Sequence, residues 1–187
     1  EYSVRVNRQE YYAIISHMDE QIGRIIAKLK ETGKMDNTYI FFSADHGLSC
    51  GNHGLLGKQN MYEHSLKVPF MVVGPDIPKG ESRDAFVHVQ DVMATALDLG
   101  GVEKPDYVEF SSVLPLIENR KAESHLKDTL YFAYEMKLQR MVRVGDYKLI
   151  LYPQGHVVRL FNVKEDPSEM NDLVGDPAQW PRVRKMF

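Results

Sequence analysis

The residues best suited to chemistry lie in one stretch, IFFSADHGLSCGNHGLLGK, at residues 40–58. Asp45 and His46 offer a carboxylate oxygen and an imidazole nitrogen, and both atom types bind divalent cations. Gly47 allows the backbone to turn sharply beside them. Two adjacent ligands are only part of a coordination sphere, because zinc prefers about four ligands and calcium takes about six to eight oxygens. The pair therefore indicates half of a cation site.

Lys58 follows Asp45 in a glycine-rich loop that could bring its ammonium group back to an anion held at the cation. Simpler interpretations exist for each residue. In these interpretations, Asp45 caps the next turn, His46 is a hydrogen-bonded, partly buried imidazole, and Lys58 is a solvated surface charge. His53 either lines a substrate pocket or bonds its own backbone.

Two short apolar runs define the elements that must position these side chains. Residues 38–43 (TYIFFS) and 68–73 (VPFMVV) are rich in residues that favour strands, and we expect parallel strands covered on both faces. In open sheets of this kind, ligands bind beyond the carboxyl ends of the strands. Asp45 and His46 occupy that place.

Two helices are expected around these strands. Residues 8–30 carry apolar side chains at three- and four-residue spacing, and Gly33 ends the segment. We assign Tyr12 and Met18 of this helix to its core face. A second helix is predicted at residues 90–99, so the order of elements is that of an α/β layer architecture.

After Pro105 the pattern changes to four short apolar runs separated by polar turns, without helices between them. This pattern predicts an antiparallel meander, followed by a short helix near Trp180. We therefore divide the chain into an α/β part, residues 1–120, and a small antiparallel-sheet subdomain, residues 121–187.

Composition excludes several classes of function. The chain has 187 residues, 43% of them hydrophobic and 26% charged, with a formal net charge of -3. It has no basic tract interleaved with aromatic residues, so we expect no nucleic-acid partner. It has no apolar run long enough to span a membrane. Cys50 is the single cysteine, which excludes an internal disulfide, and we interpret it as a buried or half-buried thiol.

Several separated motifs together resemble the C-terminal portion of the sulfatase family, in the alkaline-phosphatase-like superfamily. They are YYAIISHMDEQIGRIIAKLKETG, SADHG, GNHGLLGK with the following Tyr62-Glu63, KVPFMVVGP, RMVRVGDYKLILY and LFNVKEDPSEMNDL. The resemblance implies an alkaline-phosphatase-like sandwich with a mostly parallel central sheet, to which the small antiparallel subdomain is added.

The resemblance also implies roles for individual residues. Asp45 and His46 would be two ligands of one divalent cation, and calcium is usual in the family, although a histidine ligand alone would suggest zinc or manganese. Lys58 would contact the sulfate and offset charge on the leaving oxygen, a catalytic and substrate-binding role. His53 is the further candidate for substrate binding. Tyr62 and Glu63 are expected to pack and orient the loop.

The family's nucleophile is absent from this chain. Sulfatases use a formylglycine made from the Cys or Ser of a C/S-x-P-x-R motif. Cys50 is followed by Gly-Asn-His-Gly and does not match that motif. We therefore expect residues 1–187 to be the back half of a longer enzyme, inactive and weakly cation-binding without its N-terminal half, which is the expected partner.

The leading hypothesis is thus hydrolysis of a sulfate ester, whether of a glycan, an aryl or an alkyl sulfate, by the parent enzyme. One alternative is a metal-dependent phosphodiesterase or phosphonate hydrolase of the same superfamily, since two-metal sites also use such strand ends. Another is a non-catalytic interaction module. The resemblance implies a periplasmic, extracellular or lysosomal enzyme.

Overall fold

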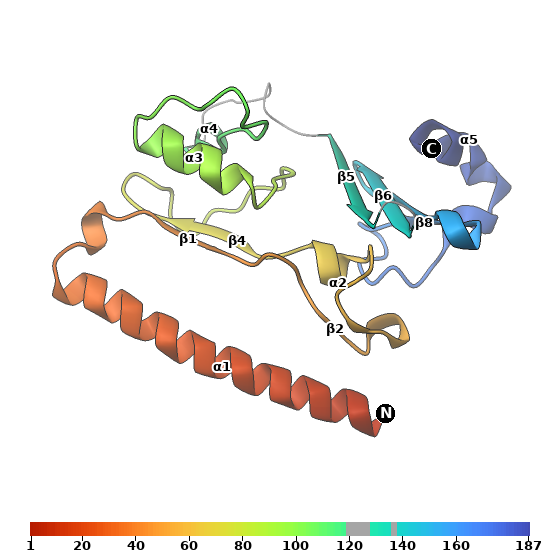
Figure 1. Ribbon diagram of the computed structural model, residues 1–187, viewed down its shortest axis with the longest axis horizontal. Helices are drawn as coiled ribbons and strands as arrows, with labels where there is room; N and C mark the ends of the chain where they lie inside the picture. Colours follow the sequence, from red (N-terminus) through yellow and green to blue (C-terminus); the bar gives the residue numbers. More distant parts are fainter. Residues whose placement is uncertain (119–127, 136–137) are drawn as a thin grey trace.

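The computed structural model describes residues 1–118, 128–135 and 138–187. Its N-terminal part places a pair of strands between one long helix and two shorter ones (Figure 1). The helices are α1 (Tyr2–Glu31), α2 (Glu63–Leu66), α3 (Asp91–Leu99), α4 (Leu114–Ile117) and α5 (Trp180–Met186). The first strands are β1 (Ile40–Ser43), β2 (Ser49–Cys50), β3 (Leu56–Gly57) and β4 (Phe70–Val73).

Strands β1 and β4 pair antiparallel, with Ile40 opposite Val73 and Ser43 opposite Phe70. The expectation that these two strands run parallel was therefore wrong. A parallel pair needs a crossover connection, usually a helix, that returns the chain to the end of the sheet where the first strand began. Here β2, β3 and the single turn of α2 bring the chain back in the opposite direction. The α/β arrangement itself is confirmed.

Helix α1 covers the predicted segment and ends as expected, because Gly33 adopts a left-handed conformation with φ of 67°. The assignment of Tyr12 and Met18 to the core was wrong for this chain, since they are 64% and 45% exposed. The helix has few neighbours here. One of them is the β2 segment, where Arg8 Nε donates to the Cys50 carbonyl oxygen at 2.8 Å. Cys50 itself is buried, as interpreted.

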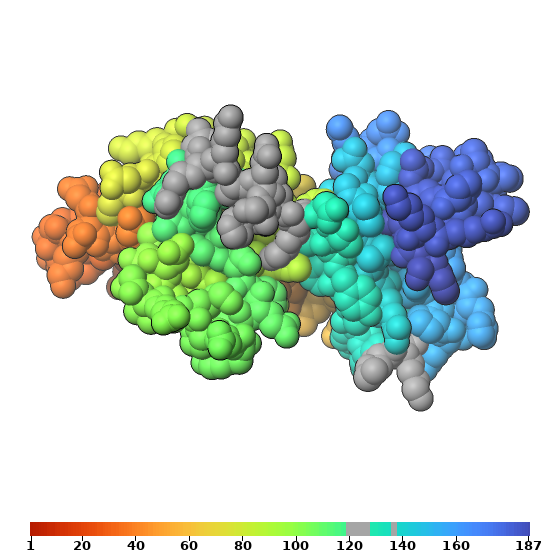
Figure 2. Space-filling model, turned by 90° about the horizontal axis from the view of Figure 1, so that it is seen from above, coloured from red at the N-terminus to blue at the C-terminus, as the bar shows by residue number. Residues whose placement is uncertain are grey.

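The C-terminal part is the predicted antiparallel meander, with strand order β5-β6-β7-β8. Its strands are β5 (Thr129–Tyr134), β6 (Gln139–Val144), β7 (Tyr147–Tyr152) and β8 (Val157–Asn162). Seen from above, the cyan-to-blue residues of this part gather at one end of the molecule (Figure 2). The expected boundary at residues 120 and 121 lies outside the described residues.

The meander is covered on both faces. On one face, buried Met141, Ile150 and Phe161 pack against Met61 and Tyr62 from the loop that leads into α2. This contact joins the two parts of the chain.

The opposite face of the meander carries Leu149 and Leu160, both almost fully buried. The C-terminal tail contacts this sheet, because the Arg182 guanidinium lies 3.6 Å from the centre of the Tyr147 ring. Side chains on both faces of the meander are therefore in contact with other elements.

Within the described ranges, no helix combines the length and the apolar character that crossing a membrane requires.

Candidate functional site

Asp45 and His46 lie just beyond β1, which ends at Ser43, as the sequence predicted. The Asp45 side chain is 85% exposed and that of His46 is 35% exposed. Asp45 Oδ1 accepts a hydrogen bond from the His46 backbone N–H at 3.1 Å, and Asp45 Oδ2 lies 3.2 Å from His46 Nε2. The carboxylate is thus held beside the imidazole and remains open to solvent.

The imidazole of His46 is oriented by its own neighbour in the chain. Its Nδ1 lies 2.9 Å from the carbonyl oxygen of Gly47. A carbonyl oxygen only accepts, so this contact assigns the proton to Nδ1 and leaves a lone pair on Nε2. Lys58 Nζ contacts that same Nε2 as a donor. The structure therefore brings Asp45, His46 and Lys58 together at one point.

The two donor atoms fit one edge of a cation site. Oxygen ligands bind calcium at about 2.3–2.6 Å, so two neighbouring ligands at right angles lie roughly 3.3–3.6 Å apart. The separation of 3.2 Å between Asp45 Oδ2 and His46 Nε2 is close to that value. In the part of the chain that the structure describes, no three His, Cys, Asp or Glu side chains gather as a cation site. The chain offers a ligand pair.

Helix α2 lies directly against Gly47. The Gly47 N–H donates to the Ser65 carbonyl oxygen at 2.8 Å. A Cβ placed on Gly47 would lie 2.0 Å from the carbonyl oxygen of His64, far inside any real contact. Glycine is required at this position because α2 approaches the backbone beside His46 so closely.

The structure places His53 in a different environment. Its ring stacks on Tyr62 with centroids 3.9 Å apart, and it lies 5.8 Å from the His64 ring. Among the described residues these are its ring contacts, so it is not brought into the group formed by Asp45, His46 and Lys58. His53 has φ of 53°, a left-handed conformation that suits a loop residue.

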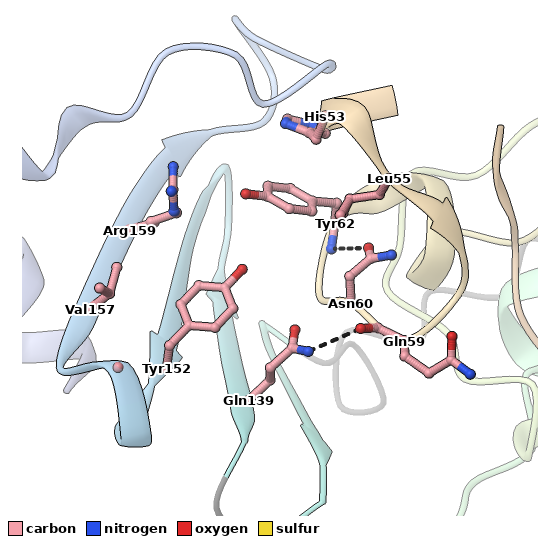
Figure 3. Close-up of a pocket in the computed structure, with 10 residues that line it drawn as sticks. His53, Leu55, Gln59, Asn60, Tyr62, Gln139, Tyr152, Val157 and Arg159 are labelled. Atoms are coloured by element: carbon pink, nitrogen blue, oxygen red, sulfur yellow. Dashed lines mark hydrogen bonds between the residues drawn. The ribbon is translucent and has the colours of Figure 1, made fainter. Parts of the chain in front are cut away.

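His53 also lines a pocket, and its role in substrate binding stays a prediction. The pocket has a volume of about 510 Å³ and lies between the loop around residues 53–62 and strands β7 and β8 (Figure 3). Tyr62 and Tyr152 face each other across it, and the Arg159 side chain borders it. Burial, followed by the nearby Tyr62, raises the pKa of the Tyr152 phenol.

Beside this pocket, His64 is kept neutral. Burial, followed by the neighbouring His53 and then Lys148, lowers the pKa of His64 from 6.5 to about 4. Its Nε2 is buried without a hydrogen-bond partner, which adds to the cost of charging the ring.

Sequence reasoning missed a buried group of charges behind α2. Lys148, fully buried on β7, lies 2.8 Å from Glu63 Oε1 and 2.8 Å from Glu169 Oε1. Arg143 Nη1 is 3.2 Å from Glu63 Oε2. Burial raises the pKa of Glu169, and the Lys148 ammonium acts in the opposite direction. The available signal was a lysine inside the otherwise apolar strand YKLILY.

Comparison with known proteins places the chain in a family. The family model described as Sulfatase matches residues 3–102, which is more than half of the chain. The chain is 31% identical over 187 residues to an N-acetylglucosamine-6-O-sulfatase of Bacteroides thetaiotaomicron, covering 95% of this chain and 33% of that protein. It is 31% identical to an arylsulfatase of Clostridium perfringens, covering 92% and 37%.

Solved structures agree with these relatives. A structure determined in complex with its substrate D-glucosamine-2-N,6-O-disulfate superposes with a TM-score of 0.84 at 29% identity, covering 92% of this chain and 37% of that one. A phosphonate monoester hydrolase of Agrobacterium radiobacter superposes with a TM-score of 0.79 at 25% identity, covering 95% and 39%.

The chain thus spans about a third to two fifths of the length of these relatives. Proteins of this group are generally metal-dependent. The family model, the relatives and the matched structures agree, and the chain belongs to the sulfatase family, within the alkaline-phosphatase-like superfamily.

Proposed function

We propose that this chain is the C-terminal portion of a sulfuric ester hydrolase and supplies Asp45, His46 and Lys58 to its active site. The observation that carries the proposal is the convergence of Asp45 Oδ2, His46 Nε2 and Lys58 Nζ at the end of β1. Asp45 and His46 bind one divalent cation, calcium by family resemblance. When bound, that cation draws negative charge from the sulfate oxygens.

Lys58 acts on the leaving group. In the hydrolysis the bond between sulfur and the ester oxygen breaks, and the sulfur keeps three oxygens and gains one from an attacking hydroxyl. The proton lost by that hydroxyl is taken up by the ester oxygen, which leaves as an alcohol. Negative charge grows on that oxygen as the bond lengthens, and the Lys58 ammonium offsets it by donating a hydrogen bond. A cation at His46 Nε2 would displace Lys58 from that nitrogen and free its N–H groups for the ester.

The attacking group is proposed to come from the rest of the enzyme, as a formylglycine. The relatives are about three times as long as this chain, which leaves room for that segment and for the remaining cation ligands. The proposed substrate is a sulfated sugar or another small sulfate ester, because a matched structure holds a sulfated glucosamine as its substrate. The proposed location is the periplasm, the lysosome or the outside of the cell.

The exposed side of α1 supports the proposal that a further portion of the same protein packs on this chain. Ile14, Met18 and Ile25 follow one another at helical spacing and are 66%, 45% and 62% exposed. Apolar stripes of this kind are covered in stable enzymes. We assign this stripe to contact with the remaining portion of the catalytic domain.

The test uses the full reading frame and a chromogenic aryl sulfate. Lys58→Ala should lower kcat by about 10²–10³-fold, the usual cost of removing one donor to a developing oxyanion. Lys30→Ala, on the exposed end of α1, serves as the control and should change kcat less than twofold. Equal rates for Lys58→Ala and the native enzyme would contradict the assigned role.

A second candidate function is hydrolysis of a phosphonate or phosphate ester. It is favoured by the match to a phosphonate monoester hydrolase and by 32% identity to the multifunctional alkaline phosphatase superfamily protein PehA of Trinickia caryophylli. Comparison of kcat/KM on aryl sulfate and phenyl phosphonate, together with a count of bound metal ions, separates the two. Preference for the phosphonate would replace the sulfatase proposal.

A further inference from the structure

We propose that Lys148 is a positioning residue for the end of β1, where Asp45 and His46 lie. Lys148 belongs to the C-terminal sheet and acts on that strand end through Glu63 and α2. Its expected effect on cation binding rests on the proposed function, whereas its effect on the strand end does not. Four observations carry the proposal.

The first observation is the charge balance around Lys148. Its ammonium group has no exposure and lies 2.8 Å from both Glu63 Oε1 and Glu169 Oε1. Arg143 completes the group through Glu63 Oε2 and also lies 4.8 Å from the centre of the Phe86 ring. Two cations thus face two carboxylates in a largely buried space. Removing Lys148 would leave buried carboxylates without their closest cation.

The second observation is that α2 cannot hold its own position. The helix is one turn long, Glu63–Leu66, and helices of that length are unstable without outside contacts. Tyr62 at its start provides no side-chain cap. Instead, Glu169 Oε2 accepts a hydrogen bond from the Glu63 backbone N–H at 2.6 Å, from 106 residues further along the chain. The sheet and its following segment therefore hold the start of α2.

The third observation concerns the other end of the same turn. The Ser65 carbonyl oxygen accepts the Gly47 N–H at 2.8 Å, and the His64 carbonyl oxygen occupies the space where a Gly47 side chain would begin. Gly47 directly follows His46, whose Nδ1 contacts the Gly47 carbonyl oxygen. A shift of α2 is therefore transmitted to the imidazole.

The fourth observation is the face of the sheet that carries these contacts. Lys148 and Phe161 are partners in the β7 and β8 register, and Phe161 packs with Met61 and Tyr62 beside α2. Leu149 and Leu160, the next pair, point to the opposite face. The chain thus contains a matched control: Leu160 is as buried as Lys148 and belongs to the same sheet, but faces away from α2.

The experiment compares Lys148→Met and Leu160→Ala in the full reading frame, at a temperature where both variants remain folded. Amide hydrogen exchange is measured in a peptide covering residues 44–48. Lys148→Met should speed exchange of the Gly47 amide at least tenfold, and Leu160→Ala should change it less than twofold. Unchanged exchange in Lys148→Met, or an equal increase in Leu160→Ala, would overturn the proposal.

A second readout uses calcium binding to the metal-stripped protein, measured by calorimetry. Lys148→Met should weaken binding about tenfold, and Lys148→Arg should restore most of the affinity because it keeps the charge. If Lys148→Met folds poorly, Glu169→Gln replaces it, because it preserves side-chain size and should also weaken calcium binding. If Asp45→Asn leaves calcium affinity unchanged, the proposed cation site is wrong, while the exchange measurement still decides the positioning role. Where Asp45→Asn does weaken calcium binding, full calcium affinity in Lys148→Met would contradict the positioning role.

Discussion

At the scale of single residues, His64 connects the buried charges to the strand end. Its backbone carbonyl oxygen lies against Gly47, and its ring lies beside the stacked rings of His53 and Tyr62, 5.8 and 5.7 Å from their centres. Because burial disfavours the imidazolium, the neutral ring is the form that the native packing accommodates. The protonation of one side chain is therefore linked to the folding of the loop.

This linkage predicts a pH dependence of stability. The pKa of His64 is about 4 in the folded state and 6.5 when unperturbed, so between those values the unfolded chain binds a proton that the folded chain does not. The free energy of unfolding should fall as pH is lowered from 6.5 to 4. His64→Gln should reduce that loss, as measured by urea midpoints at several pH values. An identical pH profile in the variant would contradict the prediction.

Individual residues differed in how well the sequence indicated them. The convergence of Asp45, His46 and Lys58 followed from their order along one strand end and one glycine-rich loop. Lys148 was not identified, because a lysine in a strand is ordinarily exposed and its two carboxylate partners lie 85 residues before and 21 residues after it in sequence. Ligand and catalytic roles for these residues remain predictions.

At the scale of elements, α1 has two apolar stripes rather than one. Tyr11, Ile15, Ile22 and Ile26 are half-buried in this chain, whereas Ile14, Met18 and Ile25 are exposed. A helix with apolar residues over so much of its surface is suited to lie between two layers. The exposed stripe therefore has measurable consequences in the complete enzyme.

We predict that Ile14→Gln destabilises the protein expressed from the full reading frame by about 1.5–3 kcal/mol, the value of burying a large aliphatic side chain. Glu20→Gln on the same helix is the control, and surface changes of that kind cost less than about 0.5 kcal/mol. Denaturant unfolding measures both. If Ile14→Gln matches the control, the stripe is not covered by the rest of the enzyme.

The elements also explain what sequence patterns can and cannot predict. The meander was predictable because apolar runs alternate with short polar turns, and such turns join antiparallel neighbours. The direction of β1 relative to β4 was not, because an apolar run carries no information on strand direction. The connection through α2 decided it, and four residues of helix give too short a pattern to recognise.

At the scale of the whole molecule, the two parts meet through Met61, Tyr62 and Glu63 on one side and the β6 to β8 face on the other. The interface combines an apolar centre with the charged group around Lys148. A site binds more tightly when contacts of this kind hold its binding residues in position before the ligand arrives.

Cation removal tests the molecule as a unit. For the full-length enzyme, calcium at about 100 times its dissociation constant should add about 2.7 kcal/mol to the free energy of unfolding. Chelation with EDTA should therefore lower Tm, and Asp45→Asn should have a low Tm that EDTA does not change further. Thermal melts with and without chelator make the comparison. A response of Asp45→Asn equal to that of the native enzyme would place the cation elsewhere.

The shared carboxylates of Glu63 and Glu169 also bear on how sulfatases can be recombined. A hybrid enzyme that takes residues 128–187 from a relative would receive a new lysine partner and a new cap for α2, while keeping its old Glu63 loop. An exchange that transfers the loop and the sheet together keeps these charges matched. Grafting the C-terminal sheet alone from a relative that lacks this lysine or glutamate should therefore impair the host's catalytic centre.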